Sequence, residues 1–159
     1  MHGAAALTVI STGLLLTARA LLGRRVLVVT VRGPSMEPTY RDGDRVLIRR
    51  DILPAPGRVV VAEPPWAGTG RGAHPVPVPS GTVMALSERD WLIKRVAAVP
   101  GDLVPRYLPS LAQVPEERVP PGQVVLLGDN AEVSLDSRQM GYVPLGRVLG
   151  TVVRVLESR

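Results

Sequence analysis

Three segments of the chain combine residue types that could do chemistry, and one of them is centred on a lysine. Lys94 is the only lysine among 19 basic residues, and it lies in the apolar run WLIKRV at residues 91–96. In a strand, alternation puts its side chain on the face opposite Ile93 and Arg95. Burial among aliphatic side chains favours the neutral amine, which can accept a proton, whereas arginine stays protonated in proteins. The pattern therefore predicts a general base, although a lone lysine in a strand is more often a solvated edge residue.

A serine follows an apolar run in the second segment, GPSMEPT at residues 33–39. Ser35 stands among glycine and proline residues that hold the backbone on an unusual path. In such a place a serine can offer its hydroxyl as a nucleophile and its own amide to a developing oxyanion. The same residues are also typical of an ordinary turn, and that interpretation stays open.

The third segment, GDNAEVSLDSR at residues 128–138, is rich in polar side chains. Asp136 and Arg138 are two positions apart, so in an extended segment they lie on one face and can pair. Ser134 could orient a neighbouring amine. The alternative is a polar loop held together by local hydrogen bonds.

Composition excludes several other kinds of site. The chain has no cysteine, so disulfides, thiolate metal sites and cysteine nucleophiles are ruled out. Its two histidines, His2 and His74, lie near no carboxylate at ligand spacing, so we expect no metal, no cofactor and no histidine-dependent triad. The net charge of +5 fits an anionic partner. Because the arginines are scattered and aromatic residues do not alternate with them, we expect no nucleic-acid binding.

The elements that must position these residues are predicted to be strands. The chain has 159 residues, enough for one domain of usual size, and lacks phenylalanine, so its core must be built from Val, Leu, Ile and Ala. Short apolar runs bounded by Gly, Pro and Asp predict an antiparallel, mainly β fold. We expect a turn at 42–44 and strands at residues 26–31, 45–49, 59–62, 82–86, 91–99, 123–127 and 148–156.

The first 25 residues differ from the rest of the chain. Residues 3–22 contain a single charge, Arg19, and a helix of that length rises about 30 Å, which matches the hydrocarbon core of a bilayer. We expect residues 1–25 to form a membrane anchor and residues 26–159 to form the β-rich domain. A cleaved signal peptide and an interfacial or soluble helix are the alternatives. Pro/Gly-rich loop insertions are expected near 64–81 and 103–122.

Taken in order, three motifs resemble those of a known family. GPSMEPT at 33–39, IKRVAAVPGD at 93–102 and GDNAEVSLDSRQMGYVP at 128–144 are similar to the motifs of the type I signal peptidases, the S26 serine peptidases. The resemblance implies a signal peptidase/LexA-like catalytic domain with one N-terminal transmembrane helix. It also implies a serine endopeptidase that removes signal peptides from exported preproteins.

The resemblance also implies a role for each matching residue. Ser35 is the expected nucleophile, with its backbone amide as the oxyanion donor, and Lys94 is the expected general base. Ser134 is expected to hold the lysine amine, and the pair of Asp136 and Arg138 to brace the site. Asp129 and Asn130 are expected in supporting roles. Some members carry a serine two positions before the nucleophile, where this chain has Gly33.

Partners and location follow from the same resemblance. We expect a single-pass protein of the cell membrane, in contact with lipid, with an extracytoplasmic catalytic domain and a monomeric state. The arginines at 19, 24 and 25 would favour the opposite orientation by the positive-inside tendency. The alternatives are a dedicated maturation peptidase, a self-cleaving LexA-like regulator, and a non-enzymatic basic β-domain tethered to a membrane.

Overall fold

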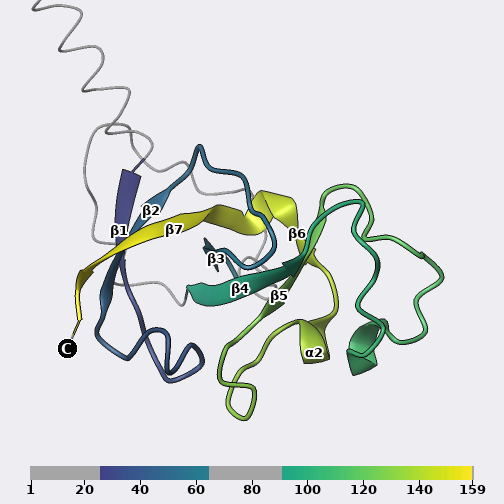
Figure 1. Cartoon of the computed structure of the whole chain (residues 1–159), viewed down its shortest axis with the longest axis horizontal. Coiled ribbons are helices and arrows are strands. Elements are labelled where there is room, and N and C mark those ends of the chain that lie inside the picture. Colours follow the sequence, from purple (N-terminus) through teal and green to yellow (C-terminus); the bar gives the residue numbers. More distant parts are fainter. Residues whose placement is uncertain (1–25, 65–90, 159) are drawn as a thin grey trace, which may run out of the picture.

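The computed structural model of the chain describes residues 26–64 and 91–158. This part of the chain is built from short strands (Figure 1). They are β1 (Val26–Thr30), β2 (Arg45–Arg49), β3 (Val59–Ala62), β4 (Leu92–Ala98), β5 (Gln123–Leu127), β6 (Val143–Pro144) and β7 (Val148–Glu157). Three single-turn helices complete it: η1 (Pro109–Leu111), α2 (Ser137–Met140) and η2 (Leu145–Arg147).

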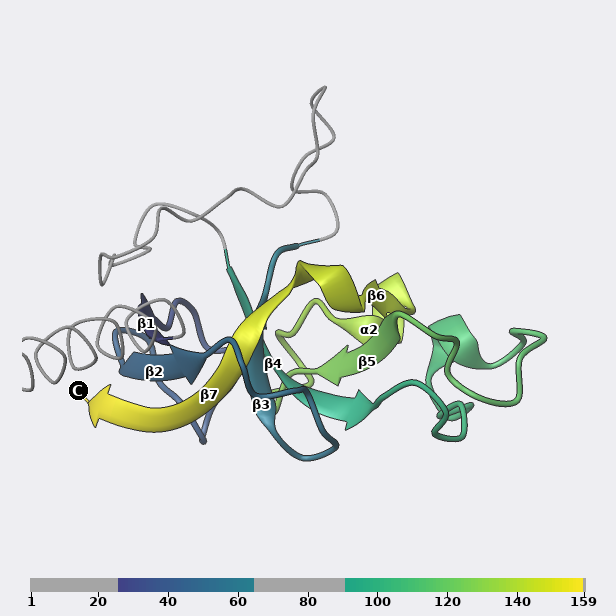
Figure 2. The same cartoon turned by 90° about the horizontal axis from the view of Figure 1, so that it is seen from above.

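The strands form one seven-stranded antiparallel sheet in the order β1-β2-β7-β3-β4-β5-β6. The ten-residue strand β7 joins its two halves, because its later residues pair with β2 and its first residues pair with β3. Irregular register interrupts both pairings, and such bulges increase the local bend and twist of a strand. Figure 2 shows the resulting curvature of β7.

Aliphatic side chains fill the core in three clusters. The first lies among β1 to β4 and includes Met36, and the second lies among β3 to β6. The third joins β4 and β5 to the segment between them, residues 99–122, which we call the accessory lobe. Figure 1 shows this lobe extending from the side of the sheet opposite to β1 and β2. A valine-rich sequence without phenylalanine thus builds a core from many small branched contacts.

Most predicted strands are confirmed, with ends within one residue of those expected. The predicted strand at 82–86, nearly all of the loop at 64–81 and the apolar segment at 3–22 lie outside the described residues. Sequence patterns missed β6 and the three single-turn helices, which are too short for a periodic signal. Within residues 26–64 and 91–158, no helix has the length and apolar character needed to cross a membrane.

Candidate active site

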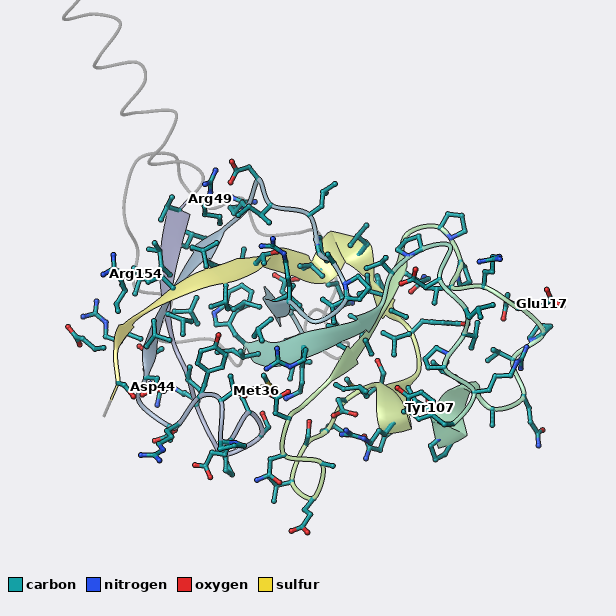
Figure 3. All side chains as sticks on the ribbon, in the orientation of Figure 1. Met36, Asp44, Arg49, Tyr107, Glu117 and Arg154 are labelled. Carbon is teal, nitrogen blue, oxygen red and sulfur yellow. The ribbon has the colours of Figure 1, made fainter. Side chains whose placement is uncertain are left out.

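Ser35 lies in a tight turn that follows β1. Backbone bonds from Glu37 N to the Pro34 carbonyl and from Tyr40 N to the Met36 carbonyl form this turn, so the turn interpretation is correct for the local backbone. The next side chain, Met36, is fully buried in the first core cluster and anchors the turn (Figure 3). The turn therefore presents Ser35 from a fixed backbone.

The start of the turn is held by a carboxylate. Gly33 has a φ of 74°, in the region that favours glycine, and its amide donates to Asp42 Oδ1 at 2.8 Å. Among the described residues, the amide of Ser35 itself has no hydrogen-bond acceptor. It is therefore available to donate to a substrate oxygen.

Lys94 is buried and points at Ser35. Its side chain extends from the middle of β4, where it pairs with Val60 on β3, and the residue is only 3% exposed. Its Nζ lies 2.8 Å from Ser35 Oγ, within hydrogen-bond distance. Burial lowers the pKa of the Lys94 amine from its ordinary value, with Asp136 opposing this shift and Arg138 adding to it. The alternative of a solvated edge lysine is therefore wrong.

A glycine makes room for these groups. The register between β4 and β5 pairs Arg95 with Leu127, and continuing it places Gly128 across from Lys94. A Cβ at position 128 would lie 2.1 Å from Ser134 Oγ and 2.7 Å from the carbonyl oxygen of Ser35. Gly128 was not among the site residues predicted from the sequence. A glycine at the end of a strand does signal close approach of another chain segment.

Asn130 connects the polar segment at 128–138, which we call the 128–138 loop, to the serine turn. Its amide donates to the carbonyl of Ser35 at 3.1 Å. Asn130 therefore contacts the serine turn through its backbone amide, and this hydrogen bond holds Ser35 in place.

Asp136 is the centre of the 128–138 loop. It is completely buried, and its Oδ2 accepts from Gly128 N at 2.7 Å, Ser134 Oγ at 2.6 Å and Arg138 Nη1 at 2.7 Å. These three donors, of which the Arg138 guanidinium also forms an ion pair, satisfy a carboxylate that would otherwise be costly to bury. The Ser134 hydroxyl donates its proton in the hydrogen bond to Asp136. Any hydrogen bond between Ser134 and the Lys94 amine must therefore have the Ser134 oxygen as its acceptor.

The expected extended geometry at residues 136–138 is wrong, although the two side chains do pair. Asp136 is the N-cap of α2, where it accepts from the amide of Arg138 and forms a capping box with Gln139. An aspartate followed three positions later by glutamine favours this cap over an extended strand. The ion pair between Asp136 and Arg138 is thus made across the first turn of a helix.

A second ion pair, between Arg95 and Asp129, connects β4 to the start of the 128–138 loop. Arg95 holds Asp129 through two bonds, Nε to Oδ1 at 2.8 Å and Nη2 to Oδ2 at 2.6 Å, and also reaches Thr39 and the carbonyl of Gly57. Thr39 Oγ1 donates to Asp129 Oδ2 at 2.5 Å. The Arg95 guanidinium lowers the pKa of the Asp129 carboxyl. Arg95 and Thr39 were not predicted as site residues from the sequence, because their importance depends on contacts between distant segments.

The arrangement can activate a hydroxyl without histidine. A buried amine whose pKa is lowered can take the proton of Ser35, and the Ser35 amide can stabilise an oxyanion. Nothing among the described residues groups three or more His, Cys, Asp or Glu side chains as a metal site would. The pair of Ser35 and Lys94 has the groups needed for nucleophilic attack on a carbonyl.

Comparison with known proteins identifies the family of this chain. A family model described as signal peptidase, peptidase S26, matches residues 2–107 and 105–156. The chain is 31% identical to mitochondrial inner membrane protease subunit 1 of Mus musculus, over 79% of this chain and 66% of that protein. It is 30% identical to probable signal peptidase I-2 of Synechocystis, over 81% of this chain and 63% of that protein.

A third relative extends the range of organisms. Signal peptidase IB of Staphylococcus aureus strain COL is 27% identical, over 77% of this chain and 73% of that protein. The chain spans just under two thirds of the length of the mouse and Synechocystis relatives. The family model covers nearly the whole sequence, and the chain therefore belongs to the peptidase S26 family of signal peptidases.

Proposed function

We propose that this protein is a membrane-anchored serine endopeptidase that cleaves N-terminal signal peptides from exported preproteins. The observation that carries the proposal is the 2.8 Å contact between Ser35 Oγ and the buried amine of Lys94. Family membership supports it, and so do the signal peptidase names of two relatives. The proposed reaction uses only side chains and backbone of the chain, with no metal or cofactor.

In the first half of the reaction, Ser35 Oγ attacks the scissile carbonyl carbon while its proton passes to the neutral Nζ of Lys94. The amide of Ser35 donates to the carbonyl oxygen as it becomes negative. The C–N bond then breaks, and the proton on Lys94 moves to the departing nitrogen. The products are the released amine and an ester of the substrate on Ser35.

In the second half of the reaction, water is the nucleophile and Ser35 Oγ is the leaving group. Water attacks the ester carbonyl and gives its proton to Lys94, and the bond to Ser35 Oγ breaks as the serine recovers its proton. Ser134 keeps the Lys94 amine oriented in both halves by accepting one of its N–H bonds, while Asp136 and Arg138 hold Ser134. Asp129 and Asn130 hold the surrounding segments in register.

Substrate binding is proposed along the open edge of β4. Leu92–Lys94 pair with β3 on one side, but among the described residues the pairing of β4 with β5 begins only at Arg95. An extended peptide can add to such an edge through main-chain hydrogen bonds and pass Lys94 and Ser35. We expect the substrate to carry small side chains before the cut.

The remaining parts of the proposal concern location and assembly. Residues 1–25 form the membrane anchor, residues 26–159 form a monomeric, LexA-like peptidase domain, and that domain lies on the extracytoplasmic side. A second candidate is a maturation peptidase with a narrow set of substrates. It is favoured by the similarity to mitochondrial inner membrane protease subunit 1.

Two substitutions test the catalytic pair. The full chain in detergent is incubated with a panel of labelled preproteins, and both Ser35→Ala and Lys94→Arg are expected to abolish cleavage. Lys94→Arg keeps the positive charge but cannot accept the serine proton, because guanidinium stays protonated. Arg154→Lys, on the exposed part of β7, is a matched control that should cleave normally. A folded Lys94→Arg protein that still cleaves would contradict the mechanism.

A further inference from the structure

A hydrogen bond connects the accessory lobe to the 128–138 loop. Ser110, within η1, donates from its hydroxyl to the carbonyl of Ser137 at 2.5 Å, across 27 positions of sequence. The bond is partly buried, and η1 packs against α2 beside it. The neighbouring Leu111 is 1% exposed and sits in the third core cluster, so Ser110 is held in place by the core.

Ser137 is the residue immediately after Asp136. Its own hydroxyl is completely buried and accepts from the amide of Leu126 on β5, so the first turn of α2 is held from two sides. The Asp136 carboxylate in turn accepts hydrogen bonds from the Ser134 hydroxyl and the amide of Gly128. A displacement at Ser137 would therefore move Asp136 and Arg138, the two residues on either side of it, whose charges act on the Lys94 amine.

Hydrogen bonds within the accessory lobe hold its backbone. Arg106 donates to the carbonyls of Ala112, Val114 and Glu116, and Arg118 donates to the carbonyl of Gly101. These bonds satisfy the backbone of a segment that has little regular structure. Figure 3 shows Glu117 at the tip of the lobe, far from Met36 in the serine turn.

We propose that Ser110 is a positioning residue for the reaction, which holds the 128–138 loop against Lys94 through the carbonyl of Ser137. This inference rests on the proposed function for its kinetic consequence. Its structural consequence, a change in the surroundings of Lys94, can be measured without any cleavage. Ser110 touches no reacting atom and acts only through α2 and Asp136.

The experiment compares Ser110→Ala, Ser110→Thr and Tyr107→Ala in the full detergent-solubilised chain. Ser110→Ala is expected to lower kcat about three- to tenfold, the effect of losing one hydrogen bond, with KM little changed. Ser110→Thr keeps the hydroxyl and should restore the rate. Tyr107→Ala removes a side chain of the same lobe that is 75% exposed, and should leave the rate unchanged.

The second measurement is independent of activity. Lys94 is the only lysine, so incorporating ¹³C-labelled lysine gives one Cε signal whose chemical shift reports the titration of this amine. Burial is the largest influence on that titration, with Asp136 and Arg138 as the charged groups facing the amine. A loosened loop admits water, so Ser110→Ala should move the titration to higher pH, and Ser110→Thr should move it back.

The outcomes separate the two proposals. If the titration moves in folded Ser110→Ala but the wild-type chain cleaves no preprotein, the positioning role stands and the proposed function fails. If the wild-type chain cleaves and Ser110→Ala matches it in both kcat and titration, the positioning role is wrong. A Ser110→Thr protein that behaves like Ser110→Ala would also overturn it, because the hydroxyl would then be irrelevant.

Discussion

At the scale of single residues, the main feature is a lysine in an environment that disfavours its charge. Lys94 is almost fully buried, and desolvation outweighs the attraction of Asp136 in setting its pKa. The Asp136 carboxylate accepts four hydrogen bonds, two of them from Arg138, so its charge is largely balanced by groups other than Lys94. The neutral amine needed for proton transfer is therefore reached at a lower pH than in a free lysine.

We predict that cleavage increases with pH and levels off below the ordinary lysine pKa. Burial lowers the pKa of Lys94, so the amine loses its proton as pH rises through that lowered pKa and becomes a competent base. The profile of kcat/KM against pH measures this in the free enzyme. The same midpoint should appear in the titration of the single ¹³C-labelled lysine, and two clearly different midpoints would mean that another group controls the rate.

Gly128→Ala should lower cleavage by about 100-fold, the effect of displacing catalytic groups by roughly 1 Å. The new methyl group would lie 2.1 Å from Ser134 Oγ and 2.7 Å from the Ser35 carbonyl oxygen, so one of these segments must move. Gly146→Ala is the matched control, because a Cβ there meets no atom within 4 Å. Comparable kcat/KM values in the two variants would show that the close approach at Gly128 has no catalytic importance.

At the scale of elements, β4 carries two functional side chains on its opposite faces. Lys94 faces Ser35, while Arg95 connects the serine turn at Thr39, the turn at Gly57 and the start of the 128–138 loop at Asp129. The bonds from Arg95 keep the loop and the turn at a fixed distance from the strand. Alternation along β4 thus supplies both the base and the clamp that positions its partners.

Asp129→Asn should destabilise the fold by about 1 kcal/mol at neutral pH, as expected for a partly exposed ion pair with good geometry. The pairing with Arg95 lowers the pKa of Asp129, so its stabilisation is fully present above the ordinary carboxyl pKa of 3.8. It is lost as pH falls through the lowered pKa. Thermal melts of both proteins should therefore converge in acid, and a difference that persists at low pH would argue against the ion pair as its source.

At the scale of the whole molecule, the sheet brings together segments that are distant in sequence. Ser35 and Lys94 are 59 positions apart, and the 128–138 loop reaches the site from the far end of β5. The accessory lobe adds a support from a third direction through Ser110. The site is therefore assembled by the packing of the entire described domain.

We predict that residues 1–25 remain attached and that the peptidase domain is extracytoplasmic. The length of the apolar segment and the proposed function motivate this orientation, and the arginines after the segment bias the opposite one without determining it. The test is digestion by external protease of spheroplasts from a bacterial host that expresses the full chain. A domain that resists digestion until lysis would show the reverse orientation.

The sequence alone predicted the mainly β fold, and the resemblance of its three motifs to a known family implied the residues that we propose for catalysis. Valine-rich runs bounded by Gly, Pro and Asp predict strands because β-branched side chains favour extended backbone and those residues interrupt it. Lys94 stood out because every other basic residue is arginine, and only lysine can lose its proton. These signals are local in the sequence, so they can be read without knowledge of the tertiary structure.

Only the tertiary structure decided how the site is held together. The cap that places Asp136 at the start of α2, the space that Gly128 leaves for Ser134, the clamp of Arg95 and the support from Ser110 all depend on contacts between separate segments. Spacing along a chain predicts which face a residue occupies, but it does not predict which distant segment packs against that face. The curved sheet, with β7 joined to both halves, determines those neighbours.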